Sequence, residues 1–174
     1  MHTVWVRLNA VVFFGLTVLL GLSCLAAISK IGHSYSNQPI VHTLEMRDLK
    51  SLKSHGGVDR ALFSFDLHAD FAPAFHWNIK QIFVYVIASY ETEEKKINKV
   101  VVHDKIVEAT NPDKVLNYKG TFVKYALVDQ GDDLRSKDIT LQLMWDFMPI
   151  TGLLYMGEQP LGEASTFTLP EEYQ

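Results

Sequence analysis

The chain has 174 residues, of which 48% are hydrophobic and 21% are charged, and its formal net charge is −4. Its length is that of one domain, or of one domain with an appendage. Fourteen of the sixteen Lys and Arg residues and all twenty Asp and Glu residues lie after residue 30, so this part carries a net charge of −6. An acidic domain without a dense run of Lys or Arg lacks the patch that holds a phosphate backbone. Composition therefore argues strongly against binding to nucleic acid.

The N-terminal region holds one long apolar run. Residues 10–28 are nineteen consecutive residues without a charge. As a helix that rises about 1.5 Å per residue they extend roughly 28 Å, close to the ~30 Å hydrocarbon core of a bilayer. Arg7 and the α-amino group precede the run and Lys30 alone follows it closely, a bias that favours a cytosolic N-terminus. We predict a cytosolic segment over 1–9 and a transmembrane signal-anchor helix over 10–28.

Two other interpretations of this run stay open. A cleaved signal peptide has an apolar stretch of about 7–15 residues and a small-x-small cleavage site, a role that Cys24-Leu25-Ala26 fits. A bacterial lipoprotein would place a Leu-Ala-Gly-like box before the cysteine, where Gly21-Leu22-Ser23 lacks the aliphatic first residue. Cys24 is the only cysteine, so the domain that follows forms no disulfide within itself.

The remaining residues are predicted to form a stalk and a β domain. Residues 29–43 are polar and contain Pro39, which is typical of a stalk, so the folded domain is expected over 44–174. Apolar and polar residues alternate over 63–70 and 139–147, as in strands with one buried face. Further strands are predicted over 81–90, which is apolar on both faces and suits a central position, and over 100–107, 122–128 and 166–169.

The connections between these strands predict the fold class. Short reversals join them, no amphipathic helix is evident, and parallel strands would need crossover connections. We therefore expect an all-β, antiparallel β-sandwich preceded by one N-terminal transmembrane α-helix.

Candidate metal ligands are few. His68 and Asp70 share one strand face and His76 lies beyond them, but no HExxH motif or cysteine pair accompanies them. Because Phe65 and Leu67 occupy the opposite face, the simpler interpretation has His68 and Asp70 facing solvent. We predict no metal site.

Candidate nucleophiles and carboxylate pairs fall in polar stretches. Ser51-Leu52-Lys53 and Ser54-His55 place a serine near a base, but no G-x-S-x-G elbow is present. Glu93-Glu94 and Asp132-Asp133 lie in predicted turns, and Gly56-Gly57 lacks the following Lys-Ser/Thr of a phosphate loop. We therefore predict no catalytic residue, no cofactor and no small-molecule substrate.

The segment 71–80 is rich in aromatic residues. Phe71, Phe75 and Trp77 lie around Pro73, and Asn78 and Lys80 precede the next strand. One interpretation is a packed corner whose rings fill the core while Asn78 ties a turn. The other is a contact surface for a partner chain, because Trp and Phe are favoured interface anchors. The same choice between core and interface applies to both Trp77 and Trp145.

Several segments together resemble one known family. They are the short N-terminal anchor, Asp66-Leu-His-Ala-Asp70, Phe75-His-Trp-Asn-Ile-Lys-Gln-Ile-Phe83, Tyr90-Glu-Thr, Val101-Val-His-Asp-Lys-Ile106, Asp129-Gln-Gly and Leu141-Gln-Leu-Met-Trp-Asp-Phe-Met-Pro149. With them the chain resembles, from Met1-His-Thr to Pro170-Glu-Glu-Tyr, subunit 3 of the eukaryotic signal peptidase complex, the 22/23 kDa subunit.

This resemblance implies a single-pass endoplasmic reticulum membrane protein with a short cytosolic N-terminus and a lumenal β-sandwich. It implies a non-catalytic accessory subunit that binds and positions a separate catalytic serine protease subunit, which removes signal peptides from nascent secretory and membrane proteins. Small subunits with two membrane spans each are the other implied partners. Many animal relatives carry a glycosylation sequon where this chain has Lys137-Asp138-Ile139-Thr140, so glycosylation is not expected. An exported soluble hydrolase and a membrane-tethered binding module stay open as alternatives.

Overall fold

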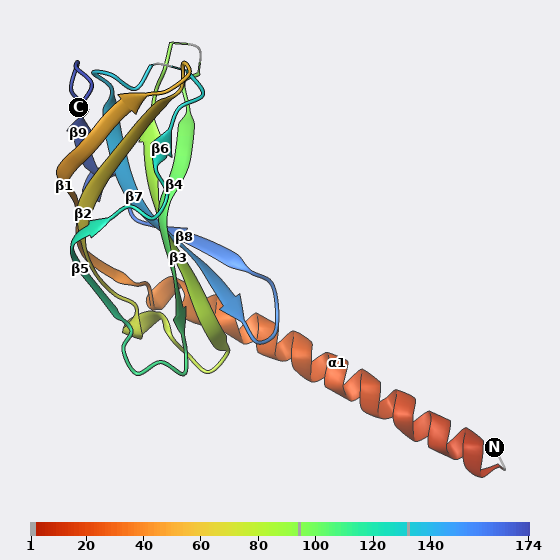
Figure 1. Ribbon diagram of the computed structural model, residues 1–174. Helices are drawn as coiled ribbons and strands as arrows, with labels where there is room; N and C mark the ends of the chain where they lie inside the picture. Colours follow the sequence, from red (N-terminus) through yellow and green to blue (C-terminus); the bar gives the residue numbers. More distant parts are fainter. Residues whose placement is uncertain (1–2, 94, 132) are drawn as a thin grey trace.

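Helix α1 (Val4–Ser36) projects from the β domain as one long rod (Figure 1). The computed structural model describes residues 3–93, 95–131 and 133–174, with side chains described except at 30–36 and 161. Residues Val4–Ser29 are apolar and long enough to cross a membrane, and none of that window is buried against the rest of the chain. A helix that is apolar on all sides and packs against nothing is suited to lipid. Residues 10–28 are helical, as predicted, and belong to a longer helix; their span across a membrane stays a prediction.

The polar stretch 29–43 is mostly regular structure, which corrects the prediction of a stalk there. Helix α1 continues to Ser36 and strand β1 (Ile40–Ser54) begins at Ile40, so only Asn37–Pro39 connect them. Pro39 is buried and helps to end the helix, because a residue before proline is disfavoured in the helical conformation. The β domain therefore begins at Ile40 rather than at 44.

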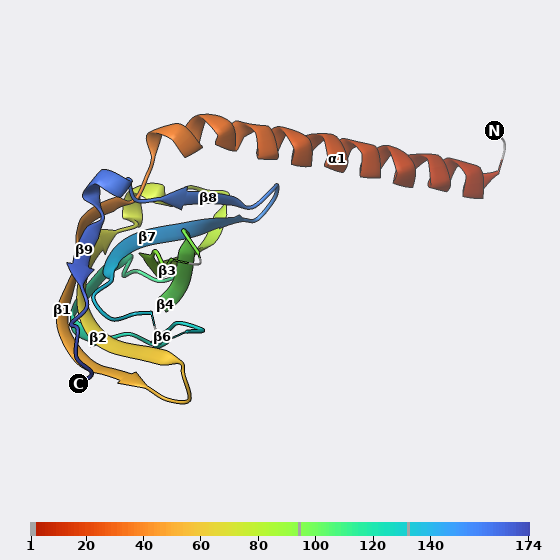
Figure 2. The same ribbon diagram turned by 90° about the horizontal axis from the view of Figure 1, so that it is seen from above.

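The β domain is a sandwich of two antiparallel sheets (Figure 2). The first sheet has the order β1-β2-β5, and a short strand, β6, also pairs with β2. The second sheet has the order β4-β3-β7-β8, and β9 pairs with the other end of β7. The remaining bounds are β2 (Asp59–Asp70), β3 (Ile79–Tyr90), β4 (Asn98–Glu108), β5 (Val115–Phe122), β6 (Leu127–Val128), β7 (Asp138–Pro149), β8 (Tyr155–Glu158) and β9 (Ser165–Thr168), with 3-10 turns at Ala72–Ala74 and Leu161–Glu163.

The core lies between the sheets, on the faces that the alternating patterns predicted. Every apolar member of the alternating series in β2 and β7 is buried, and β3 is central as expected. The buried side chains are Phe63, Phe65, Leu67 and Ala69 from β2, Ile82, Val84, Val86 and Ala88 from β3, and Ile139, Leu141, Leu143, Trp145 and Phe147 from β7. The prediction of an antiparallel all-β domain behind one N-terminal helix is confirmed.

The strand predicted over 122–128 is wrong. Strand β5 ends at Phe122, and the chain then crosses from one sheet to the other. The amide of Val123 donates to the carbonyl of Phe63 in the first sheet (3.1 Å), and the amide of Tyr125 donates to Val102 in the second (2.9 Å). Because its hydrogen bonds go to two sheets, this apolar segment bridges them at one edge instead of forming a ladder.

Candidate functional site: the outer face of the second sheet

The predicted metal-ligand candidates lie on the outer face of the first sheet and beyond it. His68 and Asp70 are half-buried rather than facing open solvent. The His68 ring lies edge-on to the His42 ring, with 4.7 Å between centroids, and the Asp70 carboxylate accepts a hydrogen bond from the amide of Ala72. His76 Nδ1 accepts from the amide of Asn78. Among the described residues, no three His, Cys, Asp or Glu side chains are grouped as metal ligands.

The serine candidates Ser51 and Ser54 lie at the end of β1, next to the β1–β2 turn. The Ser51 hydroxyl donates to the carbonyl of Gln174 at 3.3 Å. The amide of His55 donates to the carbonyl of Val58 and closes the turn, in which Gly56 and Gly57 have φ angles of +65° and +77°. These glycines are required because the left-handed region is strained for other residues. The polar residues around 54–57 therefore form a structural turn between β1 and β2.

The carboxylate pairs contribute no assembled site to the part of the chain that the structure describes. Glu93 and Asp133 are exposed, as is usual for charges in turns. Glu94 and Asp132 lie outside the described residues.

The aromatic segment before β3 divides between core and surface. Phe71 is fully buried and packs edge-on against the buried Trp145, with ring centroids 6.2 Å apart. Asn78 is also fully buried and hydrogen bonds to Thr151, so it ties a turn as the packed-corner interpretation predicted. Trp77, by contrast, is 62% exposed. Trp145 is therefore core, and Trp77 is a surface residue.

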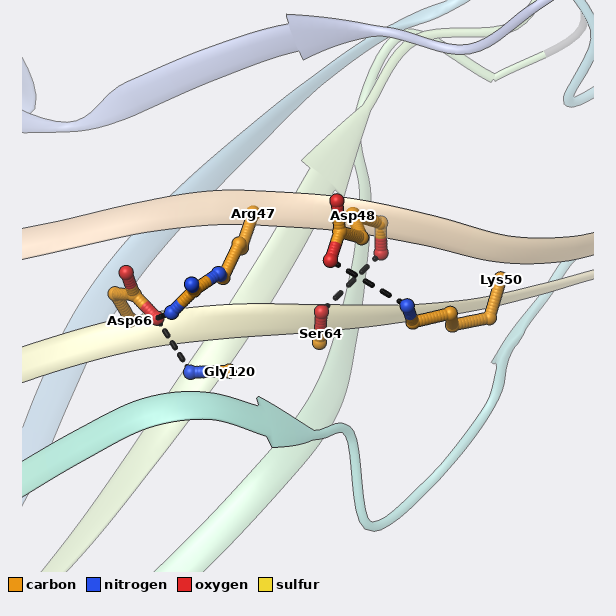
Figure 3. A network of polar contacts seen from close by, with 6 residues as sticks. All are labelled: Arg47, Asp48, Lys50, Ser64, Asp66 and Gly120. Carbon is orange, nitrogen blue, oxygen red and sulfur yellow. Dashed lines mark hydrogen bonds and ion pairs between the residues drawn. The ribbon is translucent and has the colours of Figure 1, made fainter.

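The outer face of the first sheet is occupied by charges that find partners within the sheet (Figure 3). Arg47 lies 3.5 Å from the Asp66 carboxylate, which also accepts a hydrogen bond from the amide of Gly120. Lys50 lies 3.4 Å from Asp48. Exposed ion pairs of this kind stabilise little. Apolar side chains are exposed on this sheet as well, among them Leu62 at 43% and Phe122 at 59%.

The outer face of the second sheet is apolar along its central strand. Phe83 and Tyr85 of β3 are half-buried and alternate with buried neighbours, so they lie on the face that points away from the core. Ile87 lies on the same face by register but is only 7% exposed. Residues directly opposite one another in an antiparallel pair share a face. The side chains that the register and the pleat place there form what we call the outer apolar face: Phe83, Tyr85, Ile87, Val101, Ile106, Met144 and Met156.

Polar groups within this face are paired. The Tyr85 hydroxyl donates to Asp146 at 3.4 Å, and burial, followed by the charge of Asp146, raises the pKa of Tyr85. Lys124 lies 2.8 Å from Asp104, and this hydrogen bond lowers the pKa of the Asp104 carboxyl. The face thus combines apolar side chains with paired charges, since Asp104 lies opposite Tyr85 and Asp146 opposite Phe83.

This geometry is suited to contact with another protein. Within the described residues, Phe83 and Tyr85 pack ring to ring, with centroids 5.3 Å apart, while Ile106 opposite Phe83 is 47% exposed. The sequence contained one signal for this surface, namely that the strand predicted over 81–90 is apolar on both faces. Only one of those faces packs between the two sheets; on the other, Phe83 and Tyr85 are half-buried and Ile87 is 7% exposed. Met144 and Met156 carried no such signal in the sequence.

Comparisons with known proteins agree with a role in assembly. A family model described as "Signal peptidase subunit" matches residues 1–172. The chain is 33% identical over 159 residues to signal peptidase complex subunit 3 of Drosophila melanogaster, which covers 88% of each chain. It is 33% identical over 160 residues to the Homo sapiens subunit of the same name, with 88% of this chain and 87% of that one covered. The chain therefore belongs to the signal peptidase complex subunit 3 family.

Proposed function

We propose that this chain is a non-catalytic accessory subunit of the endoplasmic reticulum signal peptidase complex. In this role it binds and positions the catalytic serine protease subunit that removes signal peptides from nascent secretory and membrane proteins. The observation that carries the proposal is the outer apolar face, which is built on a central strand and on which Val101, Ile106 and Met156 are 39%, 47% and 69% exposed. Family membership favours this role over an exported hydrolase or a cell-surface binding module.

The physical contribution of the subunit follows from its two parts. Helix α1 holds the β domain at the membrane, so its encounter with another membrane protein becomes effectively intramolecular. Covering the outer apolar face with a partner then contributes about 25 cal/mol for each Å² of apolar surface removed from water. A rigid sheet also presents its anchors without a large ordering cost. Together these effects hold the catalytic domain at a fixed height above the bilayer.

The proposed topology is single-pass type II, with the N-terminus in the cytosol and the β domain in the lumen. Arg7 on the N-terminal side of the helix supports this orientation. Small residues near the end of the helix, including Gly21 and Ser23, leave room for a neighbouring helix to approach. A Cβ atom added at Gly21 would meet no atom within 4 Å. We propose that small membrane subunits of the complex pack here.

Affinity purification of the full chain from mildly solubilised microsomes tests the proposal. We expect the catalytic serine protease subunit to co-purify with the intact chain. Deletion of residues 1–30 is expected to release the β domain from the complex and to impair cleavage. A matched variant that replaces residues 10–28 with an unrelated leucine-rich span of equal length is expected to retain the catalytic subunit through the outer apolar face. Co-purification of the deleted chain with undiminished cleavage would contradict the proposal.

A further inference from the structure

The connection between β7 and β8 carries a cluster of exposed apolar side chains. Leu153 is 82% exposed, Leu154 is 67% exposed and Ile150 is 64% exposed. Trp77 joins them, because the neighbouring residue Asn78 is hydrogen bonded to this connection at Thr151. We call Trp77, Ile150, Leu153 and Leu154 the apolar tip.

The composition of this segment is unusual for a surface loop. Residues 147–157 contain no charged side chain, although the flanking residues Asp146 and Glu158 are both acidic. Single apolar residues on a surface need no explanation, but a contiguous exposed group marks a binding surface. Tryptophan and leucine on one uncharged projection are typical of a segment that enters the boundary between headgroups and acyl chains.

The apolar tip lies at the end of a hairpin that extends alongside helix α1. Both views show the β7–β8 hairpin running beside α1, in the direction of the helix's N-terminus (Figures 1 and 2). The base of the hairpin lies where the helix enters the domain, since Asn37 and Ile40 line one groove with Trp145 and Glu158. The hairpin and the helix therefore start from the same level and extend the same way.

The lengths of the two elements place the apolar tip at the end of the apolar span. Five residues separate Glu158 from Leu153, which is roughly 17 Å at about 3.4 Å per residue of strand. Along α1 the same distance corresponds to roughly eleven residues at about 1.5 Å each, counted back from Asn37. This reaches the level of Ala26, inside the uncharged run 10–28. Measured along α1, the apolar tip thus reaches the C-terminal end of this uncharged run.

We propose that the apolar tip inserts into the lipid leaflet on the side of the membrane that holds the β domain. The inference rests on α1 spanning a membrane, as proposed above, but not on which side the domain occupies. Two attachments, the helix and the tip, would fix the tilt of the sandwich as well as its height. The outer apolar face would then meet a membrane-bound partner in one orientation only.

Fluorescence quenching in vesicles tests the proposal with the full chain. Cys24 is the only cysteine, so Cys24→Ser combined with Leu153→Cys gives one labelling site at the apolar tip. Cys24→Ser with Ile97→Cys is the matched control, because Ile97 is 78% exposed at the opposite end of the β domain, in the β3–β4 connection. Each protein is labelled with an environment-sensitive dye and reconstituted in phosphatidylcholine vesicles. Spin-labelled lipid and aqueous iodide serve as the two quenchers.

The expected result is a blue-shifted emission at position 153 that spin-labelled lipid quenches several-fold more strongly than it quenches the dye at position 97. Iodide should show the reverse order. Equal iodide quenching at the two positions would overturn the proposal, and so would protection of position 153 from both quenchers, which would mean that protein covers the tip. The native Cys24, labelled in the unchanged chain, separates the two claims. A label there that lipid fails to quench refutes the spanning helix itself rather than the tip alone.

Discussion

The carboxamide of Asn78 and the backbone of Thr151 are joined by two hydrogen bonds. Asn78 Nδ2 donates to the carbonyl of Thr151 at 2.9 Å, and the amide of Thr151 donates to Asn78 Oδ1 at 3.1 Å. The amide of Ile150 also donates to the carbonyl of Asn78, at 2.7 Å. These bonds lock the β2–β3 connection to the β7–β8 connection, which brings Trp77 beside the exposed apolar loop. The asparagine of the W-N-x-K-Q-x-F motif therefore has a structural role.

Replacing Asn78 with alanine is expected to lower the free energy of unfolding by about 1–3 kcal/mol, because buried backbone groups lose their partners. Urea unfolding of the full chain in detergent measures this loss. Asn98→Ala is the control, since the Asn98 amide donates to the carbonyls of Tyr90 and Lys95 in a more exposed hairpin. Equal losses for the two variants would contradict the role given to Asn78.

Gly157→Ala is expected to destabilise the sandwich by about 1–3 kcal/mol, the usual effect of overpacking. A Cβ atom at position 157 would overlap Nε1 of Trp145 and lie 2.7 Å from its Cε2. The buried indole cannot move freely, because it packs against Phe71. Thermal unfolding and tryptophan emission report the change. Gly162→Ala, with no atom within 4 Å of its added Cβ, should stay within about 0.5 kcal/mol of the parent chain, and an equal loss there would refute this explanation.

His103 is expected to make stability depend on pH. Its ring lies against Phe65 and Tyr118, and Nδ1 is buried without a hydrogen-bond partner among the described residues. Burial lowers the pKa of His103 below its ordinary 6.5, against the raising effect of the neighbouring Asp104. The unfolded chain therefore takes up this proton more readily than the folded chain does. The stability from a neutral His103 is fully present above about pH 6.5 and is lost as the pH falls toward the lower folded-state pKa.

Unfolding of the full chain between pH 7.5 and pH 5 measures this dependence. His103→Phe should flatten the slope in that window, because phenylalanine keeps the aromatic packing and cannot be protonated. The control is His55→Gln in the exposed β1–β2 turn, which should leave the slope as it is. A slope that His103→Phe does not alter would assign the pH dependence to other groups.

A single substitution reports the orientation of the β domain. Asp138→Asn creates the sequence Asn-Ile-Thr over residues 138–140, at an exposed position where the Asp138 side chain accepts a hydrogen bond from Thr168. Asparagine retains that acceptor oxygen, so the fold should tolerate the change. With the domain in the lumen, we expect glycosylation of this variant in microsomes and its removal by an endoglycosidase. Asp138→Gln creates no sequon and should stay unmodified, whereas an unmodified Asp138→Asn chain would argue for the opposite topology.

The strands with regular alternation were predictable, and those rich in polar residues were not. The apolar residues of β2 and β7 alternate without interruption, because both strands are flanked on two sides and face one core. Strand β1 lies at an edge and carries charges on its exposed side, so no regular alternation marked it as a strand, and its first residues, 40–43, were assigned to the stalk. Strand β5 is interrupted at Gly120, where φ is +60°. The search for alternating apolar and polar residues therefore did not find it.

Of the two candidate surfaces, one could be predicted from the sequence and the other could not. The sequence of β3, which is apolar on both faces, indicated the outer apolar face, where Phe83 and Tyr85 are half-buried. The apolar tip was not, because the run Ile150–Leu154 has the composition of a core segment. Its exposure follows from the hydrogen bonds of Asn78, which join residues that are 73 positions apart in the sequence.

The most direct test of the accessory role depletes the native subunit and asks which variants rescue it. The two variants change residues of similar exposure, one on each sheet. Ile106 on the outer apolar face is 47% exposed, and Leu62 on the first sheet is 43% exposed. Each is replaced by glutamate, and the measurement is co-purification of the catalytic subunit together with cleavage of a secretory precursor. The account predicts that the Leu62→Glu chain restores both and that the Ile106→Glu chain, folded and in the membrane, restores neither fully. Full rescue by Ile106→Glu would contradict it.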